Sequence, residues 1–246
     1  MEKEIAICLR QVSKTFRLSK RPIYTLKERV FDFFRFHGSD TFQALKNINL
    51  EIYKGECVGL VGRNGSGKST LTKIMTGIYM PDKGGKVVMH GDHLLLNLGL
   101  GFAHELTARD NVYINASILG LSQEKIKHIF DNIFEFAELQ AFVDVKIKYF
   151  SSGMVQRLAF SIAMYAESDI VFLDEVFAVG DAKFVQKATE AIEKNFMLNK
   201  NRTVILVSHS EEHILKYCSR AFLLHKGELV LTGTPQEVFA KYNTLQ

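Results

Sequence analysis

The sequence predicts an α/β fold in which buried parallel strands, covered by helices, carry a phosphate-binding loop at one edge. Three observations lead to this prediction. A glycine-rich motif at 62–70 follows an apolar run and precedes a helical pattern. Two later apolar runs, 170–173 and 204–207, end in polar residues, as buried parallel strands do at a ligand-binding edge. Mostly helical periodicity between 107 and 165 predicts a helical lobe inserted before those strands.

The composition is that of a globular protein without a marked charge bias. The 246 residues are 47% hydrophobic and 24% charged, which suits one large domain or a core with a smaller lobe. A net charge of +4 is too weak to indicate a nucleic-acid partner, and we expect none. No apolar run is long enough to span a bilayer, and the N-terminus has no signal-peptide pattern. Cys8, Cys57 and Cys218 are far apart in the sequence, within apolar runs, and are predicted to be buried, reduced thiols and not a disulfide frame or a metal site.

The N-terminal part predicts two strands separated by an unusual segment. Residues 5–9 form one apolar run, and the partial alternation at 44–52 predicts a half-exposed strand. Between them, the segment 18–42 combines basic residues with many aromatic ones, and Leu26 and Phe33 belong to one helical face. The residues alone leave two interpretations open. An amphipathic helix here packs on its own domain, or it lies against a membrane surface or a membrane partner.

The glycine-rich motif fits the phosphate-loop pattern G-x-x-x-x-G-K-[ST] at every specified position. It consists of Gly62, Arg63, Asn64, Gly65, Ser66, Gly67, Lys68, Ser69 and Thr70. Its glycines let backbone N–H groups turn inward, and the following helix adds a partial positive charge where phosphates would lie. Lys68 would reach the β- and γ-phosphates, and Ser69 would hold Mg²⁺. The motif therefore predicts a nucleoside triphosphate site.

The remaining elements are indicated by caps and turns. A strand is predicted at 87–89, and Ser122 is placed to cap a helix with an apolar face. The dipeptide 226–227 predicts a hairpin between two apolar runs. Thr234 begins a capping box, with Pro235 at the first position of a last short helix.

Polar residues at the ends of two predicted strands are candidates for chemistry. Asp174 and Glu175 end the run at 170–173, where the first acid would hold Mg²⁺ and the second would orient and activate the attacking water. His209 follows the run at 204–207 and is placed to contact a γ-phosphate. Lys68, Glu175 and His209 are thus the candidate catalytic residues.

With these motifs in place, the chain resembles the ATP-binding-cassette (ABC) ATPases over nearly its full length. The deciding stretch, 150–157, is similar to the family's Leu-Ser-Gly-Gly-Gln signature motif, and the strand with Asp174 follows it in the family's order. The resemblance implies a P-loop NTPase core, an antiparallel β subdomain and an inserted helical subdomain. The expected parts are a core at 1–106 and 167–246, including the inserted segment 18–42, and a helical subdomain at 107–166.

The resemblance also assigns roles to residues of the signature stretch. Ser151 and Gly153 would contact the γ-phosphate of a nucleotide held by the opposite subunit, and Ser152 and Met154 complete this nucleotide-binding stretch. Asp181 lies where the family has its D-loop. Because this arrangement pairs one phosphate loop with one signature motif across subunits, we expect a homodimer that binds ATP with Mg²⁺.

Other positions match the family less closely. Phe16 would be the aromatic residue that stacks on adenine, with Tyr24 and Phe42 as alternatives. Ser152 and Met154 depart from the usual signature residues, although the serine and glycine that face phosphate remain. The Q-loop glutamine is absent, and Asn97 is only a weak substitute for it.

These departures resemble the branch of the family that exports cell-surface polysaccharides. The resemblance implies an ATPase at the cytoplasmic face of the cytoplasmic membrane, bound to an integral membrane transporter subunit through which a lipid-linked polysaccharide moves. O-antigen is favoured as the cargo, with capsule or teichoic acid as the alternative. Because the sequence ends at Gln246, we expect no C-terminal carbohydrate-binding domain.

Two other classes of protein fit less well. A soluble ABC ATPase acting on ribosomes or DNA usually carries two cassettes or a long coiled coil, and the sequence shows neither. A GTPase would carry the base-reading motif N-K-x-D, which the stretch 199–202 fails at its last position.

Overall fold

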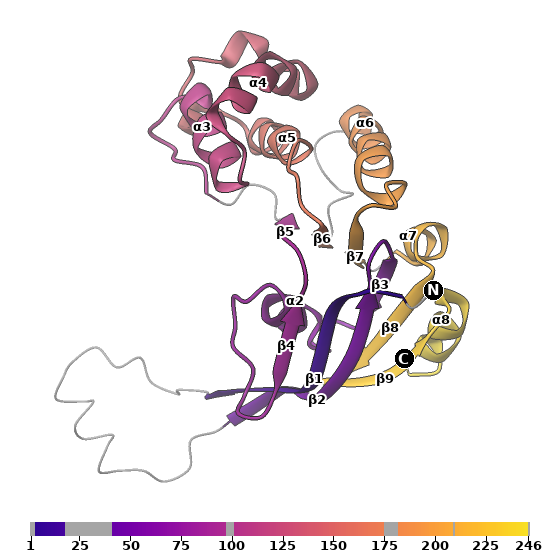
Figure 1. Cartoon of the computed structure of the whole chain (residues 1–246). Helices are drawn as coiled ribbons and strands as arrows, with labels where there is room; N and C mark the ends of the chain where they lie inside the picture. Colours follow the sequence, from indigo (N-terminus) through magenta and orange to yellow (C-terminus); the bar gives the residue numbers. More distant parts are fainter. Residues whose placement is uncertain (1–2, 18–40, 97–100, 175–181, 209, 246) are drawn as a thin grey trace, which may run out of the picture.

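The computed structural model describes residues 3–17, 41–96, 101–174, 182–208 and 210–245. These residues form two β-sheets and a helical lobe (Figure 1). The predicted combination of a mostly parallel sheet, an antiparallel sheet and inserted helices is confirmed. Of the segment 18–42, where an amphipathic helix is predicted, residues 18–40 lie outside the described residues, whereas Thr41 and Phe42 belong to a β-strand.

The smaller sheet is antiparallel and contains three strands in the order β2-β1-β4. Its strands are β1 (Ile5–Arg17), β2 (Thr41–Tyr53) and β4 (Lys86–Met89). β1 is longer than the apolar run at 5–9, because it continues to Arg17. Gln11 adopts a left-handed conformation with φ 51°, and the pairing register shifts between Leu9 and Val12. This bulge interrupts the side-chain alternation without ending the strand.

The larger sheet places the strand of the phosphate loop among parallel neighbours. It contains β5 (His93–Leu96), β6 (Ile170–Asp174), β7 (Thr203–Val207), β3 (Cys57–Val61), β8 (Arg220–His225) and β9 (Glu228–Gly233), in that spatial order. All neighbours are parallel except β8 and β9, which form the predicted hairpin. Because β3, β6 and β7 are parallel, their carboxyl ends meet at one edge of the sheet.

The central strands are continuous apolar runs because both of their faces are buried. In β6, Ile170 and Phe172 belong to a core shared with the small sheet and the helix α2 (Lys68–Met75). Val171 and Leu173 belong to a second core on the opposite face. Full burial on both faces removes the polar alternation of a half-exposed strand.

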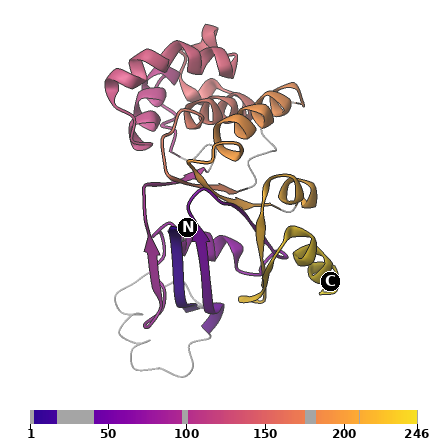
Figure 2. The ribbon, with the colours of Figure 1, turned by 45° about the vertical axis from the view of Figure 1, so that its right-hand side comes forward.

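The opposite face of the large sheet is covered mainly by helices from the C-terminal half of the chain (Figures 1 and 2). They are α6 (Ala182–Ile192), the π-helix η3 (Glu193–Met197), α7 (Glu211–Tyr217) and α8 (Pro235–Asn243). The predicted capping box is present at the start of α8, where the Thr234 side chain accepts a hydrogen bond from the Glu237 N–H. The Pro235 position at the first turn is also as predicted.

The helical lobe has its own apolar core and stands apart from the small sheet (Figures 1 and 2). It contains α3 (Ala108–Ile118), α4 (Gln123–Ala137), the 3-10 turns η1 (Gln140–Phe142) and η2 (Ile147–Tyr149), and α5 (Ser152–Ala163). As predicted, Ser122 caps α4, and its hydroxyl accepts a hydrogen bond from the Lys125 N–H.

The cysteine prediction needs a correction. Cys218 is buried, but Cys8 and Cys57 are only half-buried. Although Cys57 and Cys218 are far apart in the sequence, their sulfur atoms lie 3.7 Å from each other. The parallel pairing of β3 with β8 brings these two positions together across 161 residues of sequence.

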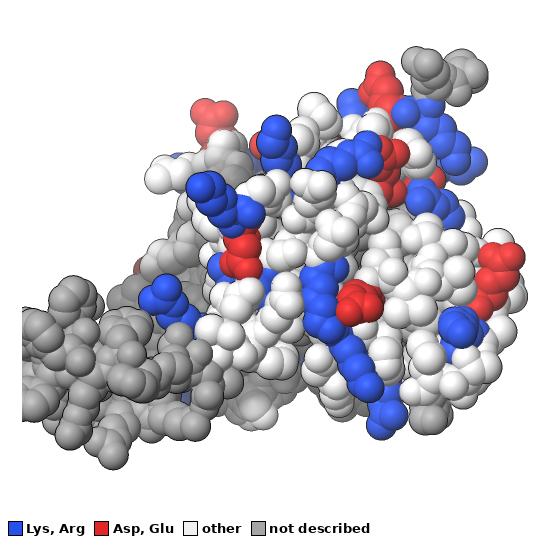
Figure 3. All heavy atoms as spheres, turned by 90° about the horizontal axis from the view of Figure 1, so that it is seen from below, with Lys and Arg blue, Asp and Glu red and all other residues white. Residues whose placement is uncertain are grey.

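The surface seen from below carries basic and acidic side chains interspersed among uncharged ones (Figure 3). Among the described residues, no helix has the length and apolar character needed to cross a membrane.

Candidate functional site

The phosphate loop follows β3 and leads directly into α2. Gly65 and Gly67 hold left-handed conformations, with φ of 78° and 109°. A Cβ atom on Gly67 would lie 2.8 Å from the Ala44 carbonyl oxygen, so the loop passes β2 too closely for a side chain. Glycine is required here both by conformation and by space.

The loop leaves the first turn of α2 open toward the pocket. Gly67 is the N-cap of α2 and provides no side-chain cap. In contrast, serine or threonine side chains cap the starts of five other helices, at Thr107, Ser122, Ser151, Ser210 and Thr234. An uncapped helix start directs backbone N–H groups and a partial positive charge toward an anion. This arrangement fits a phosphate group.

Lys68 lies within the loop and is almost fully buried. Its ammonium group donates hydrogen bonds to the carbonyl oxygens of Gly62, at 2.6 Å, and Arg63, at 3.1 Å. The hairpin β8–β9 supports the loop from behind, because the Gly227 N–H donates to the Ser66 carbonyl at 2.9 Å. The two hydrogen bonds to loop carbonyl oxygens hold the positive charge of Lys68 close to the uncapped start of α2.

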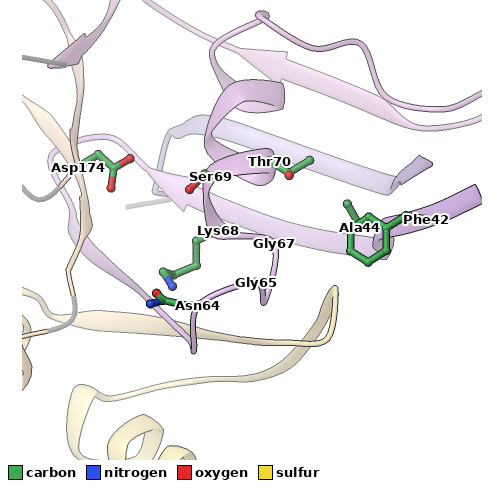
Figure 4. A pocket seen from close by; sticks show the side chains of 9 residues that line it. All are labelled: Phe42, Ala44, Asn64, Gly65, Gly67, Lys68, Ser69, Thr70 and Asp174. Carbon is green, nitrogen blue, oxygen red and sulfur yellow. The ribbon is translucent and has the colours of Figure 1, made fainter. Parts of the chain in front are cut away.

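A pocket of about 380 Å³ opens along this loop. Its lining residues are Phe42, Ala44, Asn64, Gly65, Gly67, Lys68, Ser69, Thr70 and Asp174. Figure 4 shows the Asp174 carboxylate on the same side as Ser69, whereas the Phe42 ring lies at the far end, beyond Gly67. The pocket thus has a polar, acidic end and an aromatic end.

Asp174 reaches the pocket because it is the last residue of β6. β6 pairs with β7, and β7 pairs with β3, so the carboxyl end of β6 lies at the edge where the phosphate loop begins. Its carboxylate and the Ser69 hydroxyl are hard oxygen donors, which Mg²⁺ prefers. Two protein donors suffice for this ion, since Mg²⁺ usually keeps several waters and substrate phosphate oxygens.

Four of the predicted site residues, Glu175, Asp181, His209 and Asn97, lie outside the described residues. Two of them directly follow described residues in the sequence. Glu175 comes after Asp174, the last residue of β6, and His209 comes after the buried Ser208, which follows β7. Both strand ends lie at the same edge of the sheet.

The predicted adenine contact at Phe16 is not supported by the pocket. Phe16 packs edge-on against Tyr79, with ring centroids 5.5 Å apart, and the Lys14 ammonium lies over its ring. Its neighbour across the strand pair, Phe42, lines the pocket and is 51% exposed. Phe42 is one of the two alternatives to Phe16, and the sequence does not rank these aromatic residues because it does not reveal the strand register.

The signature stretch lies in the helical lobe. Ser151 caps α5, and its hydroxyl accepts a hydrogen bond from the Met154 N–H at 3.2 Å. Ser151 and Ser152 are exposed, and none of residues 151–154 is among those that line the pocket. This capped helix start is therefore available to a second molecule.

Comparison with known protein families identifies one match. Residues 45–178 match the family described as ABC transporter. The chain is 38% identical over 245 residues to the O-antigen export system ATP-binding protein RfbB of Myxococcus xanthus, covering 96% of this chain and 55% of that protein. It is 41% identical over 209 residues to the ABC transporter protein AbcA of Aeromonas salmonicida, covering 83% and 66%.

A third relative is named for the export of a different polymer. The chain is 34% identical over 243 residues to the teichoic acids export ATP-binding protein TagH of Listeria monocytogenes serotype 4b (strain F2365), covering 99% of this chain and 71% of that protein. The chain thus spans only 55% to 71% of the length of these three relatives.

Solved structures confirm the fold. A structure described as the ATP binding subunit of an ABC transporter aligns with a TM-score of 0.71 at 19% identity, covering 97% of this chain and 93% of that one. The ATP-binding cassette MJ0796, solved as a dimer bound to ADP and Pi, aligns with a TM-score of 0.70 at 23% identity, covering 93% and 98%.

Proposed function

This chain belongs to the ABC transporter family, and we propose that it is the ATP-hydrolysing subunit of a transporter that exports a lipid-linked cell-surface polysaccharide. The single observation that carries the enzymatic part is the shared pocket of Lys68, Ser69 and Asp174. The relatives named for O-antigen and teichoic acid export support the cargo class.

The phosphate-binding role rests on the loop from Gly62 to Thr70. The uncapped start of α2 and the Lys68 ammonium would hold the phosphate chain of ATP. Phe42, at the far end of the same pocket, would stack on the adenine ring. We therefore move the proposed adenine contact from Phe16 to Phe42.

Ser69 and Asp174 would hold Mg²⁺ at the acidic end of the pocket. The ion, when bound, neutralises charge on the β- and γ-phosphates. Glu175 follows Asp174 directly and is proposed to orient and activate the attacking water, and His209, after β7, to contact the γ-phosphate. These residues act by positioning and by electrostatic stabilisation.

The functional unit is proposed to be a homodimer. The exposed start of α5, with Ser151, Ser152, Gly153 and Met154, would face the γ-phosphate of ATP bound to the other subunit. Ser151 caps α5 through the Met154 N–H alone, so other N–H groups of the first turn would remain to bind an anion. Asp181 is proposed to lie at the same dimer interface.

We place the protein at the cytoplasmic face of the cytoplasmic membrane, bound to an integral membrane transporter subunit that conducts the polymer. O-antigen is the proposed cargo, and the match to RfbB, 38% identical over 96% of this chain, supports it. Teichoic acid or capsule export is the alternative.

The export proposal is tested in the source cell with Lys68→Ala, using Lys73→Ala as the matched control. Lys73 lies one turn further along α2, where its ammonium group lies over the Tyr79 ring. The Lys68 variant should remove the polysaccharide from the cell surface and leave its lipid-linked form accumulating inside, while the control exports normally. Unchanged surface polymer in the Lys68 variant would contradict the proposal.

A further inference from the structure

Three sulfur atoms from distant parts of the chain meet outside the phosphate-loop pocket. The Cys57 Sγ lies 3.7 Å from the Cys218 Sγ and 3.7 Å from the Met197 Sδ. Cys57 is the first residue of β3, Met197 is the last residue of η3, and Cys218 follows α7. Three separate elements therefore contribute one sulfur each.

The cluster combines burial with access. Cys218 is 8% exposed and belongs to the core beneath α7, whereas Cys57 and Met197 are half-buried at its edge. Met197 ends a π-helix, an element that is rare and frequently found at functional sites. An ion could reach the half-buried pair while the third sulfur is shielded from water.

The donor type indicates a class of metal, and the spacing allows one ion. Thiolate and thioether sulfurs are soft ligands that favour soft metals such as Cu(I), and zinc sites use Cys, His or carboxylate ligands, so the Met197 thioether favours Cu(I). Two sulfurs bound to one metal at about 2.3 Å, as in zinc sites, are separated by about 3.8 Å, close to both observed spacings of 3.7 Å.

We propose that Cys57, Cys218 and Met197 form a binding site for one Cu(I) ion. Each thiol would lose its proton on binding, so one Cu⁺ and two thiols give a complex with a charge of −1 and two released protons. No electron is transferred. The site is independent of the proposed ATPase function, since none of these residues lines the phosphate-loop pocket.

Proton release makes the binding depend on pH. A thiol binds the metal as its thiolate, so the affinity for Cu(I) should rise with pH.

The test is an anaerobic titration of the purified, reduced chain with Cu(I), in competition with a chromophoric Cu(I) chelator. The wild type should bind one ion, and the Cys57→Ser and Cys218→Ser variants should lose this binding. Cys8→Ser is the matched control, because Cys8 is a half-buried thiol on β1 and is not part of the cluster. It should bind Cu(I) as the wild type does.

The Met197→Leu variant tests whether Met197 is a third metal ligand or whether the two cysteines act without it. This substitution roughly conserves volume and leaves both thiols in place, so it is informative even if the cysteine variants unfold. We expect Cu(I) affinity to fall at least about tenfold, because a ligand is lost. Unchanged affinity in Met197→Leu, absent binding in the wild type, or equal loss in Cys8→Ser would overturn the proposed site.

Discussion

Phe16 and Phe42 are directly paired across strands β1 and β2, yet of the two only Phe42 lines the pocket beside the phosphate loop. Phe16 is instead engaged with Tyr79 and Lys14. The aromatic end of the pocket is thus provided by the strand that follows the segment 18–40, and not by the strand that precedes it.

The first prediction concerns this pair. Phe42→Ala should weaken ATP binding by about tenfold, because stacking of a base on an aromatic ring contributes about 1–3 kcal/mol. Phe16→Ala is the matched control and should leave the affinity within about twofold. Calorimetric titration with ATP at fixed Mg²⁺ measures both. A larger loss in the Phe16 variant would return the adenine contact to Phe16.

The second prediction concerns the glycines of the phosphate loop. Gly67→Ala should destabilise the fold, because its φ of 109° is unfavourable for alanine and the new Cβ would lie 2.8 Å from a backbone oxygen. Gly65→Ala has a similar conformational penalty, at φ 78°, but no atom within 4 Å of its Cβ. A left-handed alanine costs about 1–2 kcal/mol. Thermal unfolding should therefore show the larger loss for Gly67→Ala, and equal melting temperatures for the two variants would contradict this explanation.

The sequence predicted the elements whose pattern is local. The strands around Val171 and Val204 are recognisable because burial on both faces makes them continuously apolar. The caps at Ser122 and Thr234 were predictable because each depends on residues within one turn. The phosphate loop was also predictable, because its glycines and its lysine all lie within the short stretch 62–70.

Long-range placement could not be predicted in the same way. Whether Phe16 or Phe42 faces the pocket depends on the register between two strands and on a bulge near Gln11. The contact between Cys57 and Cys218 depends on the pairing of β3 with β8. Neither register leaves a signal in a short window of sequence, because side-chain alternation alone does not identify the partner strand.

The third prediction concerns the metal-binding end of the pocket. Asp174→Asn should raise the Mg²⁺ concentration needed for hydrolysis and reduce turnover at least about hundredfold, because a charged metal ligand is lost. Asp169→Asn is the matched control, since Asp169 precedes the same strand at its other end. Steady-state ATPase rates over a range of Mg²⁺ concentrations measure the effect. Equal rates in the two variants would remove Asp174 from the metal site.

The fourth prediction is a pH dependence of stability at the contact between η3 and α7. The pKa of Glu193 is lowered from 4.5, mainly by its hydrogen bond from Lys216 and then by that from Tyr217. A lowered carboxyl pKa stabilises the fold fully above the unfolded-state pKa, and this contribution is lost as the pH falls through the folded-state value.

Thermal unfolding of Glu193→Gln against the wild type measures this contribution. The difference in melting temperature should be constant near neutral pH and shrink as the solution is acidified below about pH 4. Glu190→Gln, an exposed position on α6 just before this contact, should follow the wild type at every pH. A difference for Glu193→Gln that persists unchanged at low pH would exclude the ionised carboxylate as its source.

The central claim is that ATP is bound and hydrolysed between two copies of this chain, and Glu175→Gln tests it most directly. With ATP and Mg²⁺, this variant should bind nucleotide, show almost no turnover, and have about twice the 27.9 kDa mass of one chain in light scattering after size exclusion. Adding Lys68→Ala to it should restore the monomer. A Glu175→Gln protein that is saturated with ATP and still monomeric, or that hydrolyses ATP at the wild-type rate, would contradict the claim.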